Sequence, residues 1–388
     1  MLHKKMLEGL RVIEQGAFIT GPYAAMLLAD MGAEVIKVER PEGGDPFRNF
    51  EGGLYSPHFQ AYNRNKRSIT LDTRDPADRA TMDELIASAD VFIQNFRPGV
   101  AGKLGVDYDR LKAINPKLVY CSISGFGQDG PYLERPSYDT VAQALSGFLN
   151  MLLDPEDPRV SGPAIADAVT GLYAAQGVLG ALFRRSQDGA GHLVEVSMLE
   201  AMTNFAIEPY SNYFHNGKTP GAFGRAAVSQ SYVARCADGR MLALHLSSPE
   251  KFWMGLLTVL ERPELGTDPR FATRQARIQN HDALRLALQE VFAQRPREEW
   301  LARLIEADVP CAPVHDLDDT LADPQARHLG LEIAAEHPTQ GRVRTIRPAI
   351  GFDGVRETRF TAPPVLGEHN DTIRRELAGL AGEANSHE

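Results

Sequence analysis

The sequence predicts an α/β protein in which a doubly wound parallel sheet is followed by a smaller α+β domain. Short β-rich runs alternate with helical patterns through the first third of the chain, and this alternation is typical of a parallel sheet. The length of 388 residues is enough for more than one domain. A polar stretch rich in glycine and proline, residues 211–230, is the expected linker.

Five buried runs are expected to form the parallel strands: residues 10–14, 34–39, 68–72, 91–96 and 117–124. Helical patterns lie between them. In the first of these, residues 22–32, Pro22 suits the opening turn and Gly32 suits the end. A further strand is expected at residues 193–196, after a long helix of small residues.

The block after the linker has a different pattern. Residues 231–246 predict a hairpin that turns at Asp238-Gly239. Helical patterns follow at about 249–260, 281–293 and 297–307. This block therefore predicts a small α+β domain.

Charge and composition argue against several classes of protein. The formal net charge is -10, so the surface does not favour nucleic acid or anionic lipid, and an anionic ligand would need a local basic pocket. The three cysteines and eleven histidines show no metal-ligand spacing, so we expect no metal. The N-terminus lacks an apolar signal core and no run approaches membrane-spanning length, which predicts a soluble cytoplasmic protein.

One aspartate is conspicuous on physical grounds. Asp167 lies where a helix rich in small residues begins, and Gly171, Gly180 and the alanines of that helix predict a closely packed neighbour. A short acid at this place has two interpretations. It caps the orphan backbone N–H groups, or it is a nucleophile that the positive end of the helix keeps ionised.

Ligands of a doubly wound sheet bind beyond the carboxyl ends of its strands. This rule selects the following positions: residues 18–21, Arg40, residues 71–74, residues 95–97 with Lys103, and residues 125–130. Four of the selected positions are basic, namely Arg40, Arg74, Arg97 and Lys103. Any one of them could be a solvated loop charge, but their convergence on one edge favours a phosphate-bearing ligand.

Two local motifs need interpretation. Gly125, Gly127 and Gly130 match G-x-G-x-x-G, but a polar stretch follows where the dinucleotide fingerprint needs a helix, so we expect a mobile loop beside the ligand edge. Asp139 lies 28 residues before Asp167, also at a predicted helix start, and is a candidate for acid–base chemistry or for a plain cap. No serine-nucleophile elbow, phosphate-binding loop or H-E-x-x-H motif occurs.

Nine segments carry a resemblance that covers nearly the whole chain in order: GLRVIEQGAFITGPYAAMLLADMGAEVIKVERPEGGD, NRNKRSITLD, QNFRPG, SGFGQDGP, SYDTVAQALSG, ADAVTG, GAGHLVEVSMLEAM, VPCAPV and PPVLGEHN. Together they resemble the class III CoA-transferases, the family of carnitine and formyl-CoA:oxalate CoA-transferases. The resemblance implies a large Rossmann-like, CoA-binding domain built from residues 1–210 and 330–388, with the linker at 211–230 and the small α+β domain at 231–329. It also implies an interlocked homodimer.

The resemblance further implies roles for individual residues. The family's catalytic aspartate falls on Asp167. Its contacts with coenzyme A fall on strand-end positions: Phe18, Arg40, Leu71, Thr73, Asn95, Phe96 and Lys103, with Arg74 and Arg97 on the same edge. A basic contact of the formyl-CoA enzyme aligns with Pro136, and the adjacent Arg135 is its expected replacement. The residues expected to support the active site are Ile19, Gly125, Gly127, Tyr138 and Asp139.

The implied activity transfers CoA from an acyl-CoA to a free carboxylic acid through an aspartyl anhydride and an aspartyl-CoA thioester. Two alternatives stay open. The α-methylacyl-CoA racemases of the same superfamily place a histidine base where this chain has Tyr138, and a tyrosine pKa of about 10 makes a poor base. The other alternative is a CoA-binding protein without chemistry. Because the active-site glutamine of the formyl-CoA enzyme aligns with Ile19, we expect oxalate not to be the acceptor.

Overall fold

The computed structural model describes residues 5–384 and divides the chain into two compact units. Unit 1 comprises Met1–Leu149, Val160–Ile207 and Gly330–Glu388, and unit 2 comprises Asn150–Arg159 and Glu208–Leu329. The ends of the predicted large domain, residues 1–4 and 385–388, lie outside the described residues. The predicted linker, residues 211–230, is partly helical, because α9 (Ile207–Asn216) extends into it and α10 (Gly224–Ser229) follows.

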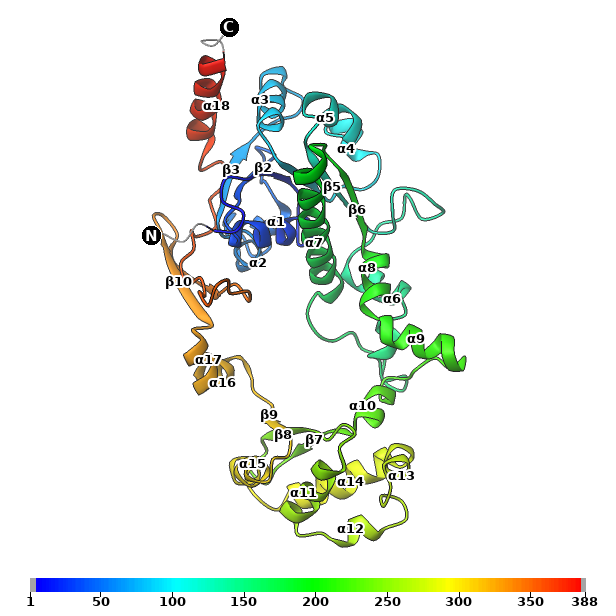
Figure 1. The fold of residues 1–388 in the computed structure, drawn as a ribbon. Helices are drawn as coiled ribbons and strands as arrows, with labels where there is room; N and C mark the ends of the chain where they lie inside the picture. The colour runs from blue at the N-terminus through cyan, green and yellow to red at the C-terminus, as the bar shows by residue number, and fades with distance from the viewer. Residues whose placement is uncertain (1–4, 385–388) are drawn as a thin grey trace. The chain divides into compact units, whose positions relative to one another are not determined.

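Unit 1 is built on a six-stranded parallel sheet with the order β3-β2-β1-β4-β5-β6 (Figure 1). The strands are β1 (Arg11–Gln15), β2 (Glu34–Glu39), β3 (Lys66–Thr70), β4 (Val91–Gln94), β5 (Val119–Ser124) and β6 (Leu193–Ser197). The predicted parallel sheet is confirmed. Strand β3 starts two residues earlier than predicted, because Lys66 is buried in an ion pair with Glu14 and is not a loop charge.

Helices cover both faces of this sheet, and the pleat gives each face its own core. Val12 of β1 packs with α1 (Thr20–Asp30) and α7 (Ile165–Asp188). Its neighbour Ile13 packs on the other face with α3 (Pro76–Ala87), α5 (Tyr108–Ile114) and α18 (Asn370–Ala384). Successive side chains of a strand point to opposite faces, so a buried parallel strand reads as a continuous apolar run.

Shorter elements of unit 1 lie in the connections and at the C-terminal end. They are η1 (Pro46–Asn49), α2 (Pro57–Ala61), α4 (Val100–Leu104), α6 (Asp139–Leu145), α8 (Met198–Phe205) and the hairpin of β10 (Glu332–His337) and β11 (Gly341–Ile346); η2 (Leu149–Met151) lies where the chain passes between the units.

The returning C-terminal segment protects the edge strand β3. The Ser68 N–H donates to Nδ1 of His369 at 3.2 Å, and the His369 N–H donates to the Ser68 carbonyl at 3.0 Å. The Thr70 N–H donates to Oδ1 of Asn370 at 2.8 Å. These bonds satisfy backbone groups that an open sheet edge would leave unpaired, and they give the G-E-H-N sequence near the C-terminus a structural role.

Helix α7 is long and apolar enough to cross a membrane by length and composition, so the expectation that no run has this length is wrong. In the structure, however, it is a core helix of unit 1. Its buried residues include Val169, Ala174, Ala175 and Val178, and the last three share a core with α1 and strands β1, β4 and β5. Core helices meet the same length and composition criteria as membrane spans.

Unit 2 contains an antiparallel sheet of β7 (Ser231–Arg235), β8 (Met241–His245) and β9 (Cys311–Pro313), so the predicted hairpin around Asp238-Gly239 is confirmed. Its remaining helices are α11 (Glu250–Leu260), α12 (Glu264–Thr267), α13 (Arg274–Gln279), α14 (His281–Phe292), α15 (Arg297–Glu306), α16 (Leu317–Ala322) and α17 (Pro324–Leu329). Trp253 and Trp300 are buried in its core.

The small residues of α7 predict a closely packed neighbour, and this expectation is right at Gly171 and wrong at Gly180. A Cβ at Gly171 would lie 3.0 Å from Cδ1 of Tyr23 and 3.1 Å from the Thr20 carbonyl oxygen on α1. A Cβ at Gly180 would have no heavy atom of the described residues within 4 Å, apart from the nearby backbone of its own helix.

We therefore expect opposite effects from two alanine substitutions in this helix. Gly171→Ala lowers the free energy of unfolding by about 1–3 kcal/mol through overpacking. Gly180→Ala raises it by roughly 0.5–1 kcal/mol, since alanine restricts the unfolded chain at a mid-helix site. Urea unfolding of both variants tests this, and equal effects would contradict the close contact between α1 and α7.

Candidate active site

The strand order reverses at β1, because β2 and β3 lie on one side of β1 while β4, β5 and β6 lie on the other. Loops after β1 and β4 therefore leave the sheet in different directions, and a crevice is expected between them. A cavity of about 340 Å³ lies at this point, lined by the loops after β1, β4 and β5 and by the first turn of α7. Its size lies in the lower part of the range for small-molecule sites.

The cavity brings together many of the predicted site residues: Phe18, Ile19, Asn95, Phe96, Arg97, Gly125, Gly127, Arg135, Tyr138 and Asp167. The remaining predicted residues do not line it: Arg40, Leu71, Thr73, Arg74, Lys103 and Asp139. Arg40 and residues 71–74 directly follow β2 and β3, so they extend along the carboxyl edge of the same sheet. One ligand that reached both groups would have to be long.

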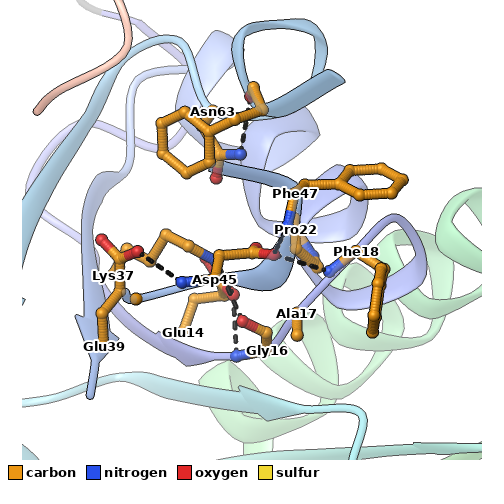
Figure 2. A network of polar contacts seen from close by, with 12 residues as sticks. Glu14, Gly16, Ala17, Phe18, Pro22, Lys37, Glu39, Asp45, Phe47 and Asn63 are labelled. Carbon is orange, nitrogen blue, oxygen red and sulfur yellow. Dashed lines mark hydrogen bonds and ion pairs between the residues drawn. The ribbon is translucent and has the colours of Figure 1, made fainter. Parts of the chain in front are cut away.

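A buried charge cluster fixes the loop after β1 (Figure 2). The Lys37 ammonium lies 3.0 Å from Oε1 of Glu14, 3.0 Å from Oδ2 of Asp45 and 2.9 Å from the Gly16 carbonyl. The Gly16 N–H donates to Glu14 at 2.8 Å, and the Phe18 N–H donates to Asp45 at 3.1 Å. Phe18 has a φ of 63°, a strained value for a residue with a large side chain. The cluster holds this strained loop in place.

Opposite charges offset the effect of burial on the pKa of Lys37 and of Glu14. Burial alone would lower the pKa of Lys37, but the carboxylates of Glu14 and Asp45 outweigh it and raise that pKa. Burial would likewise raise the pKa of Glu14, yet Lys37 and Lys66 lower it. Buried charges persist only when they are paired and hydrogen-bonded, as these are.

Asn95, after β4, ties the second loop to the first. Its side-chain oxygen accepts from the Ala17 N–H at 2.9 Å, and its amide donates to the Ala17 carbonyl and to the Thr20 hydroxyl, each at 2.8 Å. A Cβ at Gly21 would lie 3.3 Å from Cγ of the same side chain, so a larger residue there would crowd Asn95. The amide of Asn95 is thus engaged in holding the loop, although the residue lines the cavity.

Asp167 is the third residue of α7 and not its cap, because the helix begins two residues earlier, after Ala164. The side chain lines the cavity, and among residues 5–384 no hydrogen bond or ion pair engages its carboxylate. Burial, and secondarily the negative charge of Asp139, raises the pKa of Asp167 to about 7. Desolvation is therefore the larger effect on this acid, and it acts against the positive end of the helix, which was expected to keep Asp167 ionised.

Asp139 is the first residue of α6, but it caps a different helix. Its Oδ1 accepts from the backbone N–H groups of Ala166 and Asp167, at 2.7 and 3.3 Å. Its Oδ2 accepts from the Gln143 amide at 2.6 Å. Both oxygens are occupied, so of the two interpretations offered by the sequence the structure favours a cap.

The predicted basic residues differ in whether they have ion-pair or hydrogen-bond partners within the described chain. Arg74 is exposed and paired with Asp72, whereas within the described chain Arg97 and Lys103 have no ion-pair partner. Arg40 donates to the Gly44 carbonyl, and the Arg135 guanidinium lies 4.3 Å from the ring centroid of Tyr132. The free guanidinium of Arg97 at the cavity and the free ammonium of Lys103 in α4 are suited to phosphate or carboxylate ligands.

Other predicted positions have limited roles. The Leu71 side chain is buried in the core, so only its backbone could meet a ligand. No helix follows Gly130, in agreement with the rejection of the dinucleotide fingerprint. The Gly127 N–H donates to the Ser124 hydroxyl and is not free to stabilise an oxyanion. Within residues 5–384, no cluster of three or more His, Cys, Asp or Glu could hold a metal ion.

Comparison with known proteins places this geometry in a family. A sequence model described as CoA-transferase family III matches residues 7–370. The chain belongs to this family. It is a transferase enzyme of class III, as the sequence motifs predicted.

Named relatives of this CoA-transferase match it over nearly their full lengths. A succinyl-CoA:glutarate CoA-transferase of Mus musculus is 33% identical, covering 96% of this chain and 86% of the relative. An acetyl-CoA:oxalate CoA-transferase of Acetobacter aceti is 34% identical, covering 97% and 96%. The crystal structure of a CAIB/BAIF family protein from Brucella suis superimposes with a TM-score of 0.85 at 37% identity, covering 97% and 100%, and supports the predicted fold class.

The sequence patterns did not identify the residues that hold the cavity-lining loops of this CoA-transferase in place. The residues in question do not line the cavity, yet they fix the loop after β1 and Asp139; they are Glu14, Lys37, Asp45 and Gln143. One signal was available, because Lys37 interrupts the apolar run E-V-I-K-V-E, and a charge inside a strand buried on both faces needs a partner. The identity of that partner depends on the fold.

Because the pKa of Asp167 is raised, the free energy of unfolding should depend on pH. A carboxyl whose folded-state pKa lies above its unfolded value binds more protons when folded, so its contribution to stability falls as pH rises from about 4 to about 7. We expect Asp167→Asn to be more stable than the wild type at pH 8, by about 1–3 kcal/mol, with most of the gain lost near pH 4. Urea unfolding at both pH values measures this, and a pH-independent difference would show that Asp167 titrates normally.

Proposed function

We propose that this enzyme transfers CoA between carboxylic acids by covalent catalysis at Asp167. The observation that carries the proposal is the free, half-buried carboxylate of Asp167 at the wall of a cavity at the switch point of the sheet. The unpaired cations Arg97 and Lys103 lie in the β4–α4 segment, and Arg40 follows β2. They are suited to the phosphates of coenzyme A.

The reaction begins when an Asp167 oxygen attacks the thioester carbonyl carbon of the donor acyl-CoA. The carbon–sulfur bond breaks, giving a mixed anhydride and CoA thiolate. The thiolate then attacks the aspartyl carbonyl carbon, which releases the donor acid and leaves an aspartyl-CoA thioester. The acceptor carboxylate then attacks the aspartyl-CoA thioester, and the released CoA thiolate attacks the acceptor's carbonyl in the resulting anhydride, which regenerates Asp167. A direct exchange between two weak nucleophiles is thereby divided into steps that each use an activated acyl group.

Three backbone N–H groups near Asp167 are already hydrogen-bonded and are not available to stabilise the oxyanions of this reaction. The N–H groups of Ala166 and Asp167 are engaged by Asp139, and that of Gly127 by Ser124. The first turn of α7 therefore acts on the reaction by holding Asp167, and the oxyanion donors have to come from other groups around the cavity.

We propose a short dicarboxylic acid as the acceptor, with Arg135 available for its second carboxylate. Arg135 lines the same cavity as Asp167, and relatives are named for succinyl-CoA with glutarate. Oxalate is not the acceptor in this proposal, because Ile19 aligns with the active-site glutamine of the formyl-CoA enzyme. The interlocked homodimer and the cytoplasmic location also stay predictions.

Removal of the nucleophile is the direct test. Asp167→Ala is expected to abolish exchange of CoA between acids, and mass spectrometry of the wild type incubated with succinyl-CoA should find the CoA mass on the peptide that contains Asp167. Asp188→Ala, at the far end of the same helix, is the matched control and should retain activity. Near-normal turnover of Asp167→Ala would contradict the mechanism, and deuterium incorporation at Cα of a 2-methylacyl-CoA without exchange would favour a racemase.

The phosphate contacts have a separate test. Arg97→Ala and Lys103→Ala are each expected to raise the KM for acyl-CoA about tenfold, the effect of losing a charge-assisted bond of roughly 1.4 kcal/mol, with a smaller change in kcat. The control is Lys117→Ala, which removes an exposed cation before the opposite end of β5. Unchanged KM values in both variants would place the CoA phosphates elsewhere.

A further inference from the structure

Helix α7 begins without a cap of its own. Its N-cap residue is Ala164, which has no side-chain oxygen to accept from the first turn. The first N–H groups of a helix have no intrahelical acceptor, and partly buried ones need a partner. Here the partner is the carboxylate of Asp139, which precedes Asp167 by 28 positions in the sequence.

The Asp139 carboxylate is itself held rigidly. The amide of Gln143, one turn further along α6, donates to its second oxygen at 2.6 Å, and Gln143 is only 2% exposed. The oxygen of the same Gln143 amide is buried and has no hydrogen-bond partner in the described structure. Asp139 therefore receives three N–H donors, two of them from the turn that carries Asp167.

We propose that Asp139 is a positioning residue for Asp167: it supplies the cap that α7 lacks and keeps a second negative charge beside the nucleophile. The proposal rests on the function proposed for Asp167. It gives Asp139 two effects on catalysis. The cap fixes the backbone from which the Asp167 side chain enters the cavity, and the charge makes that carboxylate a stronger base and nucleophile.

Asp139 is the acid whose negative charge adds to burial in raising the pKa of Asp167. Burial is the first cause of the raised pKa of Asp167, and the charge of Asp139 is the second. The other titratable groups around it are Tyr62, whose own pKa is raised by burial and then by Asp167, and Tyr23 on α1. The cavity also contains Tyr138, Arg97 and Arg135.

The isosteric variant Asp139→Asn separates the charge from the cap. Its side-chain oxygen can still accept from Ala166 and Asp167. Its new amide would face the Gln143 amide, but a flip of Gln143 would present the oxygen that is now unpartnered. The variant is thus expected to fold with the helix start intact and without the negative charge.

Two measurements test the proposal. Loss of the Asp139 charge lowers the pKa of Asp167, so the acid limb of the kcat profile should move about 0.5–1 pH unit lower. The plateau at high pH should fall about two- to fivefold, since nucleophilicity falls with basicity. Asp139→Ala, which also removes the cap, should lose considerably more turnover than Asp139→Asn.

The second readout does not depend on turnover. Infrared difference spectra against Asp167→Asn identify the protonated carboxyl band of Asp167, and its titration midpoint should be lower in Asp139→Asn than in the wild type. Asp107→Asn is the matched control, because Asp107 caps α5 by accepting from the Arg110 N–H and does not line the cavity.

The outcomes are distinct. A lowered infrared midpoint supports the role of the charge even if Asp167→Ala shows that the proposed reaction is wrong. An unchanged midpoint in Asp139→Asn, or a shift of equal size in Asp107→Asn, overturns that role. Turnover of Asp139→Ala equal to that of the wild type overturns the role of the cap.

Discussion

The pairing of Lys37 with Glu14 and Asp45 is the interaction on which this active site depends. A lysine inside a strand buried on both faces is tolerable only when carboxylates neutralise it and its protons are hydrogen-bonded. The two carboxylates that do so also accept the backbone N–H groups of Gly16 and Phe18. The same ion pairs that make the burial of Lys37 possible therefore fix the loop at the mouth of the cavity.

The start of α7, which forms another wall of the cavity, is also held by a carboxylate. A carboxylate from another part of the chain, Asp139, satisfies backbone N–H groups at the start of α7 and thereby fixes Asp167. In both walls an acid accepts hydrogen bonds from the backbone, and the Asp167 carboxylate has no hydrogen-bond or ion-pair partner within the described residues. Such pre-organised support allows a side chain to react without first breaking bonds to the protein.

The state of Asp167 reflects a compromise between shielding and reactivity. Burial raises its pKa to about 7, so protonated and ionised forms coexist near neutral pH. In the reaction proposed for it, the ionised form would be a stronger nucleophile than an ordinary surface carboxylate, since basicity and nucleophilicity rise together. A carboxylate that attacks a thioester and then serves as a leaving group benefits from this intermediate basicity.

The sequence by itself determined the parallel sheet and the hairpin of the small unit, and it selected the carboxyl edge and Asp167 as the candidate ligand side and the candidate reactive acid. These follow from local apolar patterns, turn residues and a family resemblance carried by contiguous motifs. Tertiary structure decided what each charged residue does. Lys66 belongs to a strand and pairs with Glu14, and Asp139 caps α7 at residues 166–167. The sequence did not reveal these roles, because the partners lie far away along the chain. Pairings of this kind depend on distances across the fold, which no pattern of neighbouring residues encodes.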